Sequence, residues 1–250
     1  MDFRDIFGDA LSFPINNIVS LIIFIVLGII AGIAIGGALA GVVLGMNSNN
    51  VFTVLGSGFV GFVVALVVSF FISGYQLDII KSGIQRSPDG PAIDPVRQLL
   101  NGLKMFVVSI VYYIIPFIIV SVLSIFLRDW IMLVITFILY VIFALAQFMA
   151  QCRLAKTEDI GYALAIGEAI GDVSRVGILN LLIFVVIAFV IAFILIFIAA
   201  LIARWNSYVG GVILGIVGVY LVLFVARATG LLYSNVLINH LFFLFLIFLF

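Results

Sequence analysis

Residues 18–45 read IVSLIIFIVLGIIAGIAIGGALAGVVLG and contain no charged side chain. A stretch this long crosses a bilayer as a helix, because only a helix or a closed barrel pairs its own backbone groups in hydrocarbon. Across all 250 residues, 66% are hydrophobic, 9% are charged, and the mean hydropathy is +1.48. Soluble domains carry about 25% charged residues, so the sequence predicts an all-α integral membrane protein.

Five further apolar stretches have the length of a membrane span. Together with residues 18–45 they form three expected hairpins, with turns at 46–50, 128–129 and 204–207. The five stretches lie near residues 52–75, 105–127, 130–151, 178–203 and 208–226.

Basic residues are divided unequally between the two sides of the membrane in this topology. One side holds only Arg128 and Arg204, next to the two tryptophans, Trp130 and Trp205. The other side, which the positive-inside rule places in the cytoplasm together with the N-terminus, holds Arg4, Lys81, Arg86, Arg97, Lys104, Arg153, Lys156, Arg175 and Arg227. The acidic opening of the chain does not resemble a cleavable leader. We therefore expect a multi-pass protein of the cell membrane.

A short amphipathic stretch precedes each expected hairpin on this cytoplasmic side. These stretches lie near residues 2–12, 94–104 and 166–177, and they contain Gly8, Gly102 and Gly171. The pattern predicts a helix in the membrane plane, an elbow helix, before each hairpin. The chain is then one membrane domain, 1–250, with repeats near 2–80, 94–156 and 162–233 and an apolar tail at 234–250.

The first amphipathic stretch carries Asp2, Asp5 and Asp9 on its polar face. An anionic leaflet would repel this face, so we expect it to dock on protein. The expected partners are the basic residues of the second connection, which are also candidates for contact with anionic lipid: Lys81, Arg86, Arg97 and Lys104.

Few residues are suited to catalysis or metal binding. The only histidine, His240, lies far along the chain from the only cysteine, Cys152, which is expected to be a reduced packing residue. Asp78 is interpreted as a solvated helix end close to Lys81. We therefore expect no enzyme activity, no metal and no cofactor, and the balance of 11 basic and 11 acidic residues argues against nucleic acid as a partner.

Polar residues form a seam along the second hairpin. The seam comprises Thr136, Tyr140, Gln147 and Gln151, faced by Ser109, Tyr112, Tyr113 and Pro116. It could line a narrow solute path, because polar groups in a membrane usually face the bundle interior or water. It could instead hold the two helices together through hydrogen bonds, and this second interpretation is favoured.

Glycines form three rows with small-xxx-small spacing. The rows are Gly28, Gly32 and Gly36; Gly37, Gly41 and Gly45; and Gly211 and Gly215. Such rows let helix backbones approach closely. The contact can lie within one chain, which is the favoured interpretation, or between chains.

The chain ends in ten apolar residues after His240. Residues 231–250 are long enough to cross the membrane once, but Asn235, Asn239 and His240 would then enter it. We favour a tail that lies along the interface or against a partner.

Several short motifs resemble an uncharacterised archaeal family, the domain of unknown function 4013. They are Ala10-Leu11-Ser12-Phe13-Pro14, Gly74-Tyr75, Arg86, Pro88-Asp89-Gly90-Pro91, Leu99-Leu100-Asn101-Gly102-Leu103-Lys104 and Tyr112-Tyr113-Ile114-Ile115-Pro116. The resemblance extends over about residues 5–233 and implies an archaeal six-span protein, without an activity or substrate.

These observations favour a non-catalytic membrane protein that acts through assembly. It would be a scaffold or subunit in contact with membrane lipids and other chains, as a homo-oligomer or in a membrane complex. The alternative is a small-solute transporter or channel that uses the polar seam of the second hairpin.

Overall fold

The computed structural model describes the backbone of all residues except 1, 128, 206 and 250, and the side chains of all but these and 129, 207, 208, 211 and 236–250. All regular secondary structure in this part of the chain is helical. The helices are α1 (Phe3–Asn16), α2 (Ile18–Asn47), α3 (Val51–Ile84), α4 (Pro95–Phe126), α5 (Asp129–Thr157), α6 (Ile160–Leu164), α7 (Ile166–Val176), α8 (Ile178–Ala203) and α9 (Ser207–Leu249).

Six of these helices contain stretches long and apolar enough to cross a membrane, as the sequence predicts. The stretches are Ile18–Asn47, Val51–Ile84, Pro95–Phe126, Trp130–Thr157, Ile178–Ala203 and Val212–Asn235. Consecutive members pack as the hairpins α2–α3, α4–α5 and α8–α9. The predicted placement of the apolar tail along the interface or against a partner depends on residues 236–250, whose side chains are not described. The surroundings of Gly211 are likewise not described.

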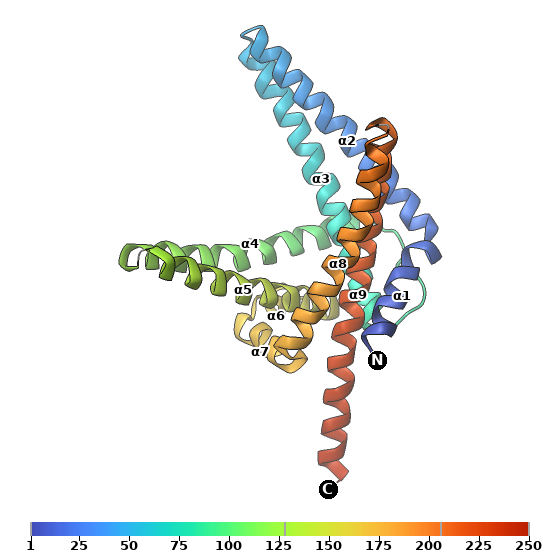
Figure 1. Cartoon of the computed structure of the whole chain (residues 1–250), viewed down its shortest axis with the longest axis vertical. Coiled ribbons are helices and arrows are strands. Elements are labelled where there is room, and N and C mark those ends of the chain that lie inside the picture. The colour runs from blue at the N-terminus through green and yellow to red at the C-terminus, as the bar shows by residue number, and fades with distance from the viewer. Residues whose placement is uncertain (1, 128, 206, 250) are drawn as a thin grey trace.

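The hairpin α4–α5 leaves the shared base in a different direction from the other two, and the outer end of α2–α3 extends beyond α8–α9 (Figure 1). Trp130, which follows the turn of the second hairpin, and Trp205, which lies in the turn of the third, are 72% and 95% exposed. Large apolar side chains along the hairpins are also exposed, for example Phe52 near the first turn and Phe137 in α5. The buried core is therefore confined mainly to the base.

Two of the three expected elbow helices are separate helices. In α1, Asp2 and Asp5 form a capping box, and Asn17 separates the helix from α2. In α7, the chain turns into α8 at Gly177, whose φ of 88° is open to glycine and unfavourable for other residues. Each helix buries one apolar face, including Ile6 and Phe7 of α1.

The second expected elbow is not a separate helix. Asp94 caps the backbone N–H of Arg97 at 3.2 Å, Pro95 occupies the first turn, and α4 then continues without interruption to Phe126. Gly102 alone does not end the helix, because a glycine in a helix interior costs only about 1 kcal/mol. The short helix α6 was not expected from the sequence.

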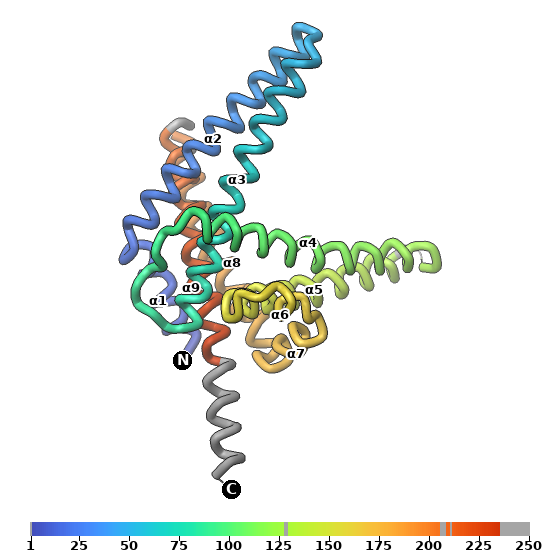
Figure 2. The backbone as a smooth tube through the Cα atoms, turned by 180° about the vertical axis from the view of Figure 1, so that it is seen from behind, coloured from blue at the N-terminus to red at the C-terminus, as the bar shows by residue number. Residues whose placement is uncertain are grey.

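The helices meet in a packed base that we call the hub. It comprises α1, α6, α7, the N-terminal parts of α2 and α8, the C-terminal parts of α3 and α5, the first half of α4 and the middle of α9 (Figure 2). The central element is α9, in which nearly every residue from Leu223 to Ser234 is buried. Sequence hydropathy places the end of span six near Ala226, but the helix continues through the hub.

Candidate functional site

Four polar nodes join the helices within the hub. The first is centred on Asp78 of α3, which is only 6% exposed. Its carboxylate accepts hydrogen bonds from Arg97 Nη2 at 3.0 Å and from Asn101 Nδ2 at 3.2 Å, both on α4. The interpretation of Asp78 as a solvated helix end near Lys81 is therefore wrong. A carboxylate can be buried here because α4 supplies a positive charge and hydrogen-bond donors that replace the water molecules around a solvated carboxylate.

Two glycines allow α3 and α4 to approach closely enough for this node. A Cβ atom at Gly74 would overlap the backbone carbonyl of Gln98, and one at Gly102 would overlap the carbonyl of Phe70. Neither glycine belongs to the three rows with small-xxx-small spacing. A third close contact joins α3 to α9, where Gly83 faces Gly230.

The second node joins α5, α7 and α9 around Arg153. The guanidinium of Arg153 donates to Asp172 Oδ2 at 3.1 Å and also pairs with Glu168. The hydroxyl of Tyr233 donates to the same Asp172 oxygen at 3.2 Å. Cys152 is fully buried beside this node in the chain, as expected of a packing residue.

The third node joins α9 to α1 and to the α3–α4 connection. Arg227 is 1% exposed and donates from Nε to Asp9 Oδ1 at 2.7 Å and from Nη1 to the Ser87 carbonyl at 2.7 Å. Its guanidinium carbon lies 4.8 Å from the centre of the Phe13 ring, a distance typical of a cation–π contact. The first amphipathic helix thus docks on protein, but its basic partner is Arg227 and not the expected set.

The fourth node joins α3 and α4 to Glu158, which follows α5. Lys81 Nζ contacts the Glu158 carboxylate at 2.5 Å, and Lys104 Nζ donates to the Glu158 carbonyl at 2.9 Å. The hydrogen bond from Lys81 is the main cause that lowers the pKa of Glu158 below its usual value, and the nearby charge of Lys104 lowers it further. This ion pair remains partly exposed to solvent.

The four basic residues of the predicted docking set therefore have other partners. Lys81 and Lys104 contact Glu158, and Arg97 contacts Asp78. Arg86 donates to Ser234 Oγ at 3.1 Å and to Asn235 Oδ1 at 2.7 Å. The set connects hairpins to one another and does not contact the acidic face of α1, because α1 packs against α9.

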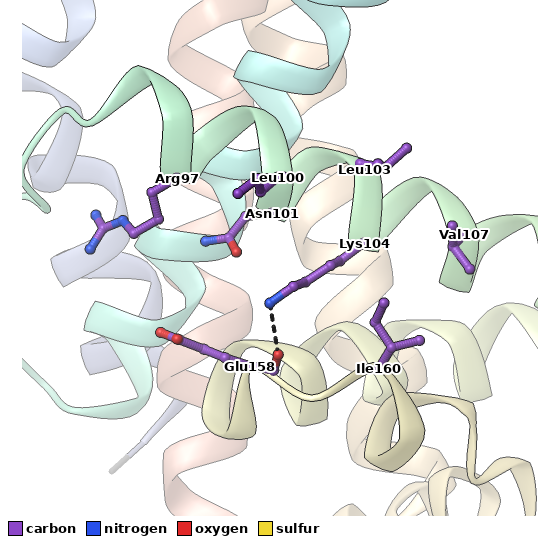
Figure 3. A pocket seen from close by; sticks show the side chains of 8 residues that line it. All are labelled: Arg97, Leu100, Asn101, Leu103, Lys104, Val107, Glu158 and Ile160. Atoms are coloured by element: carbon purple, nitrogen blue, oxygen red, sulfur yellow. Dashed lines mark hydrogen bonds between the residues drawn. The ribbon is translucent and has the colours of Figure 1, made fainter.

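A pocket of about 400 Å³ opens between α4 and the chain after α5 (Figure 3). Its polar lining comes from Arg97, Asn101, Lys104 and Glu158, and its apolar lining from Leu100, Leu103, Val107 and Ile160. The ammonium group of Lys104 extends from α4 toward the Glu158 carbonyl on the opposite side (Figure 3).

The polar seam of the second hairpin is only partly brought together. Gln147 Nε2 of α5 donates to Ser109 Oγ of α4 at 3.1 Å. Tyr112 is buried, but its hydroxyl donates to the Ala163 carbonyl of α6 at 2.9 Å. Tyr113 is 57% exposed and does not share a face with Tyr112, since consecutive helical residues differ by about 100°. Three further members of the seam are half-buried on α5: Thr136, Tyr140 and Gln151.

The glycine rows differ in their surroundings. Gly41 lies against Ser57 and Gly45 against Val54, so this part of α2 packs closely on α3. A Cβ atom added at any of five other row members would meet no atom of the described structure within 4 Å: Gly28, Gly32, Gly36, Gly37 and Gly215.

Among the described residues, no group of three or more His, Cys, Asp or Glu side chains is arranged to hold a metal ion. Several buried polar side chains pair across helices, for example Asp78 with Asn101 and Arg153 with Asp172. The six helices that are long and apolar enough to cross a membrane place the chain in the class of multi-pass helical membrane proteins.

Within that class, the chain belongs to the family described as protein of unknown function DUF4013, whose model matches residues 57–204. The match is narrower than the range of about 5–233 expected from the motifs. It begins within α3 and ends after α8, so α1 and α2 lie outside it. No curated protein and no solved structure matches the chain.

Proposed function

We propose that this protein is a non-catalytic, multi-pass membrane protein that acts through assembly, as a scaffold or subunit in contact with lipid and other chains. The observation that carries the proposal is the open glycine face of α2, formed by Gly28, Gly32 and Gly36. These residues are exposed, and Cβ atoms added to them would meet nothing within 4 Å.

Glycine is an unfavourable residue in a helix interior, by about 1 kcal/mol relative to alanine. In membranes this cost is offset where glycine lets a second helix approach. Gly41 and Gly45 have such a neighbour in α3, whereas Gly28, Gly32 and Gly36 have none in the described structure. A helix of another chain would supply the missing neighbour.

The divergence of the hairpins supports the same proposal. Because the hairpins α2–α3 and α4–α5 leave the hub in different directions (Figure 1), their apolar sides are covered only in part by their own chain. The proposal places the hub and the N-terminus in the cytoplasm, with α1 and α7 as elbow helices along the membrane surface. Basic residues cluster in the hub region, in accord with the positive-inside rule.

Transport through the second hairpin has weaker support. The contact between Gln147 and Ser109 joins α4 directly to α5, which is the packing role that polar groups commonly have between membrane helices. Solute flux in liposomes that was lost in a Gln147→Leu variant would contradict the assembly proposal.

The direct test replaces Gly32 and Gly36 with leucine and measures the molar mass of the protein in mild detergent by light scattering. Leucine fits the open space in one chain, so the variant should fold, but it would hold a second helix away. We expect self-association to weaken at least about tenfold, which corresponds to about 1.4 kcal/mol.

The matched control is Gly56→Leu, since Gly56 lies on α3 and also has open space around it. This control should keep the mass of the wild type. An unchanged mass in the Gly32→Leu, Gly36→Leu variant would contradict the role of this face in assembly.

A further inference from the structure

We infer that the pocket between α4 and Glu158 binds the headgroup of an anionic phosphodiester lipid, with its phosphate at Lys104 and Arg97 and the start of an alkyl chain along Leu103 and Val107. The inference rests on the membrane placement in the proposed function and does not depend on self-association.

Charge around the pocket is complementary to a phosphodiester. Three cations, Lys81, Arg97 and Lys104, contact two acidic residues, Asp78 and Glu158. Among these five side chains, one positive charge is left over. A phosphodiester carries one negative charge and would balance it.

Donors for a phosphate are available on the pocket wall. The ammonium of Lys104 has three N–H donors, and the described structure uses one, toward the Glu158 carbonyl. Arg97 gives Nη2 to Asp78 and to the Ala92 carbonyl, while its side chain remains 44% exposed. Both cations can therefore bind an anion without breaking the nodes of the hub.

The apolar side of the pocket continues in the direction of the membrane. Leu100, Leu103 and Val107 line it on successive turns of α4 and are 56%, 46% and 36% exposed. Beyond Val107, α4 carries no charged residue to its end at Phe126. A ligand with a charged head and an aliphatic chain matches this order, whereas a small soluble phosphate would leave the apolar wall uncovered.

The volume also suits a headgroup. About 400 Å³ lies within the range of about 300–1,000 Å³ that is usual for small-molecule sites. A whole lipid would not fit, so its remaining chain would extend into the surrounding bilayer.

The test is native mass spectrometry of the full chain, purified in mild detergent and titrated with phosphatidylglycerol. Phosphatidylcholine, which has no net charge, and soluble glycerol phosphate serve as the other probes. We expect retention of phosphatidylglycerol, and a loss of about tenfold in affinity in Lys104→Gln, the effect of one charge-assisted hydrogen bond. Lys104→Arg should restore binding to within about threefold, because it keeps the charge.

Lys156→Gln is the matched control, since Lys156 is exposed on the last turn of α5 and does not line the pocket. Equal losses of affinity for phosphatidylglycerol in Lys156→Gln and Lys104→Gln would overturn the inference. Retention of phosphatidylcholine equal to that of phosphatidylglycerol would also overturn it. Glycerol phosphate that bound as tightly as the lipid would overturn it as well. If Lys104→Gln does not fold, Leu103→Asn takes its place, and it should weaken binding of the lipid.

The same spectra separate this inference from the proposed function, because they report the number of chains in each particle. Specific lipid on a strictly monomeric protein would support the lipid site and contradict self-association. Oligomers without specific lipid would contradict the lipid site alone.

Discussion

Asp78 shows how much of the hub depends on single polar residues. Its carboxylate is the shared acceptor for Arg97 and Asn101, so Asp78→Ala would leave both donors in a largely buried place. We expect a loss of about 2–3 kcal/mol in the free energy of unfolding, measured by thermal or denaturant unfolding in detergent. Asp89→Asn, at an exposed carboxylate of the α3–α4 connection, is the control. Equal effects of the two variants would contradict the structural role of Asp78.

Glu158 predicts a dependence of stability on pH. Its pKa is lower in the folded protein than in the unfolded chain, chiefly because Lys81 donates a hydrogen bond to it. The ion pair therefore stabilises the fold above the unfolded pKa of about 4.3, and this contribution is lost as the pH falls through the folded pKa.

Glu158→Gln should consequently lower the melting temperature at pH 7 and have a smaller effect at pH 3. Lys81→Gln should show the same trend, since it removes the partner. If the difference in melting temperature between variant and wild type were the same at pH 3 as at pH 7, the ion pair would not contribute to stability as described.

Individual side chains were the hardest features to predict from the sequence. Asp78, three residues after Tyr75, has the local pattern of a solvated helix end, and only the packing of α4 against α3 explains its burial. Arg227 likewise has no acidic neighbour in the sequence, because Asp9 lies at the other end of the chain. Pairing over such separations is a property of the tertiary structure.

At the scale of the helix, the crossing of α3 and α4 makes the sharpest prediction. A methyl group at Gly74 would overlap the backbone of Gln98, which cannot rotate away as a side chain can. Gly74→Ala should cost about 1–3 kcal/mol or more, since close-packed sites accept extra atoms poorly. The measurement is the free energy of unfolding in detergent.

Gly171→Ala provides the opposite case. Gly171 lies inside α7 with nothing within 4 Å of an added Cβ, so alanine should stabilise the protein by up to about 1 kcal/mol. If Gly74→Ala were as harmless as Gly171→Ala, the close approach of α3 and α4 would be wrong.

Most helices could be predicted because hydropathy reports the environment of a whole span. All six apolar stretches coincide with helices, including α8, whose predicted and observed ranges agree. Helix ends were less accurate, since α3 and α9 continue as helices from the apolar zone into the polar hub. The row at Gly28 was conspicuous in the sequence, whereas the isolated Gly74 carried no comparable signal.

For the whole molecule, a tight hub and separated hairpins have different consequences. Ion pairs in the hub connect α3 to α4, α5 to α7 and α9 to α1, and each of them has at least one buried partner. Removal of one partner from a buried pair is costly. The hairpin α4–α5 and the outer end of α2–α3 extend away from the hub in different directions (Figure 1). We therefore expect the base to be rigid and the outer hairpin surfaces to be the places where lipid and other chains bind.

The number of chains in the particle tests assembly most directly. The protein would be extracted into native nanodiscs without detergent, and the mass of each particle would be determined by native mass spectrometry. The proposed function predicts particles with more than one protein chain, either two or more copies or this chain with another membrane protein. Particles that contain a single copy, in native nanodiscs and in mild detergent alike, would contradict it.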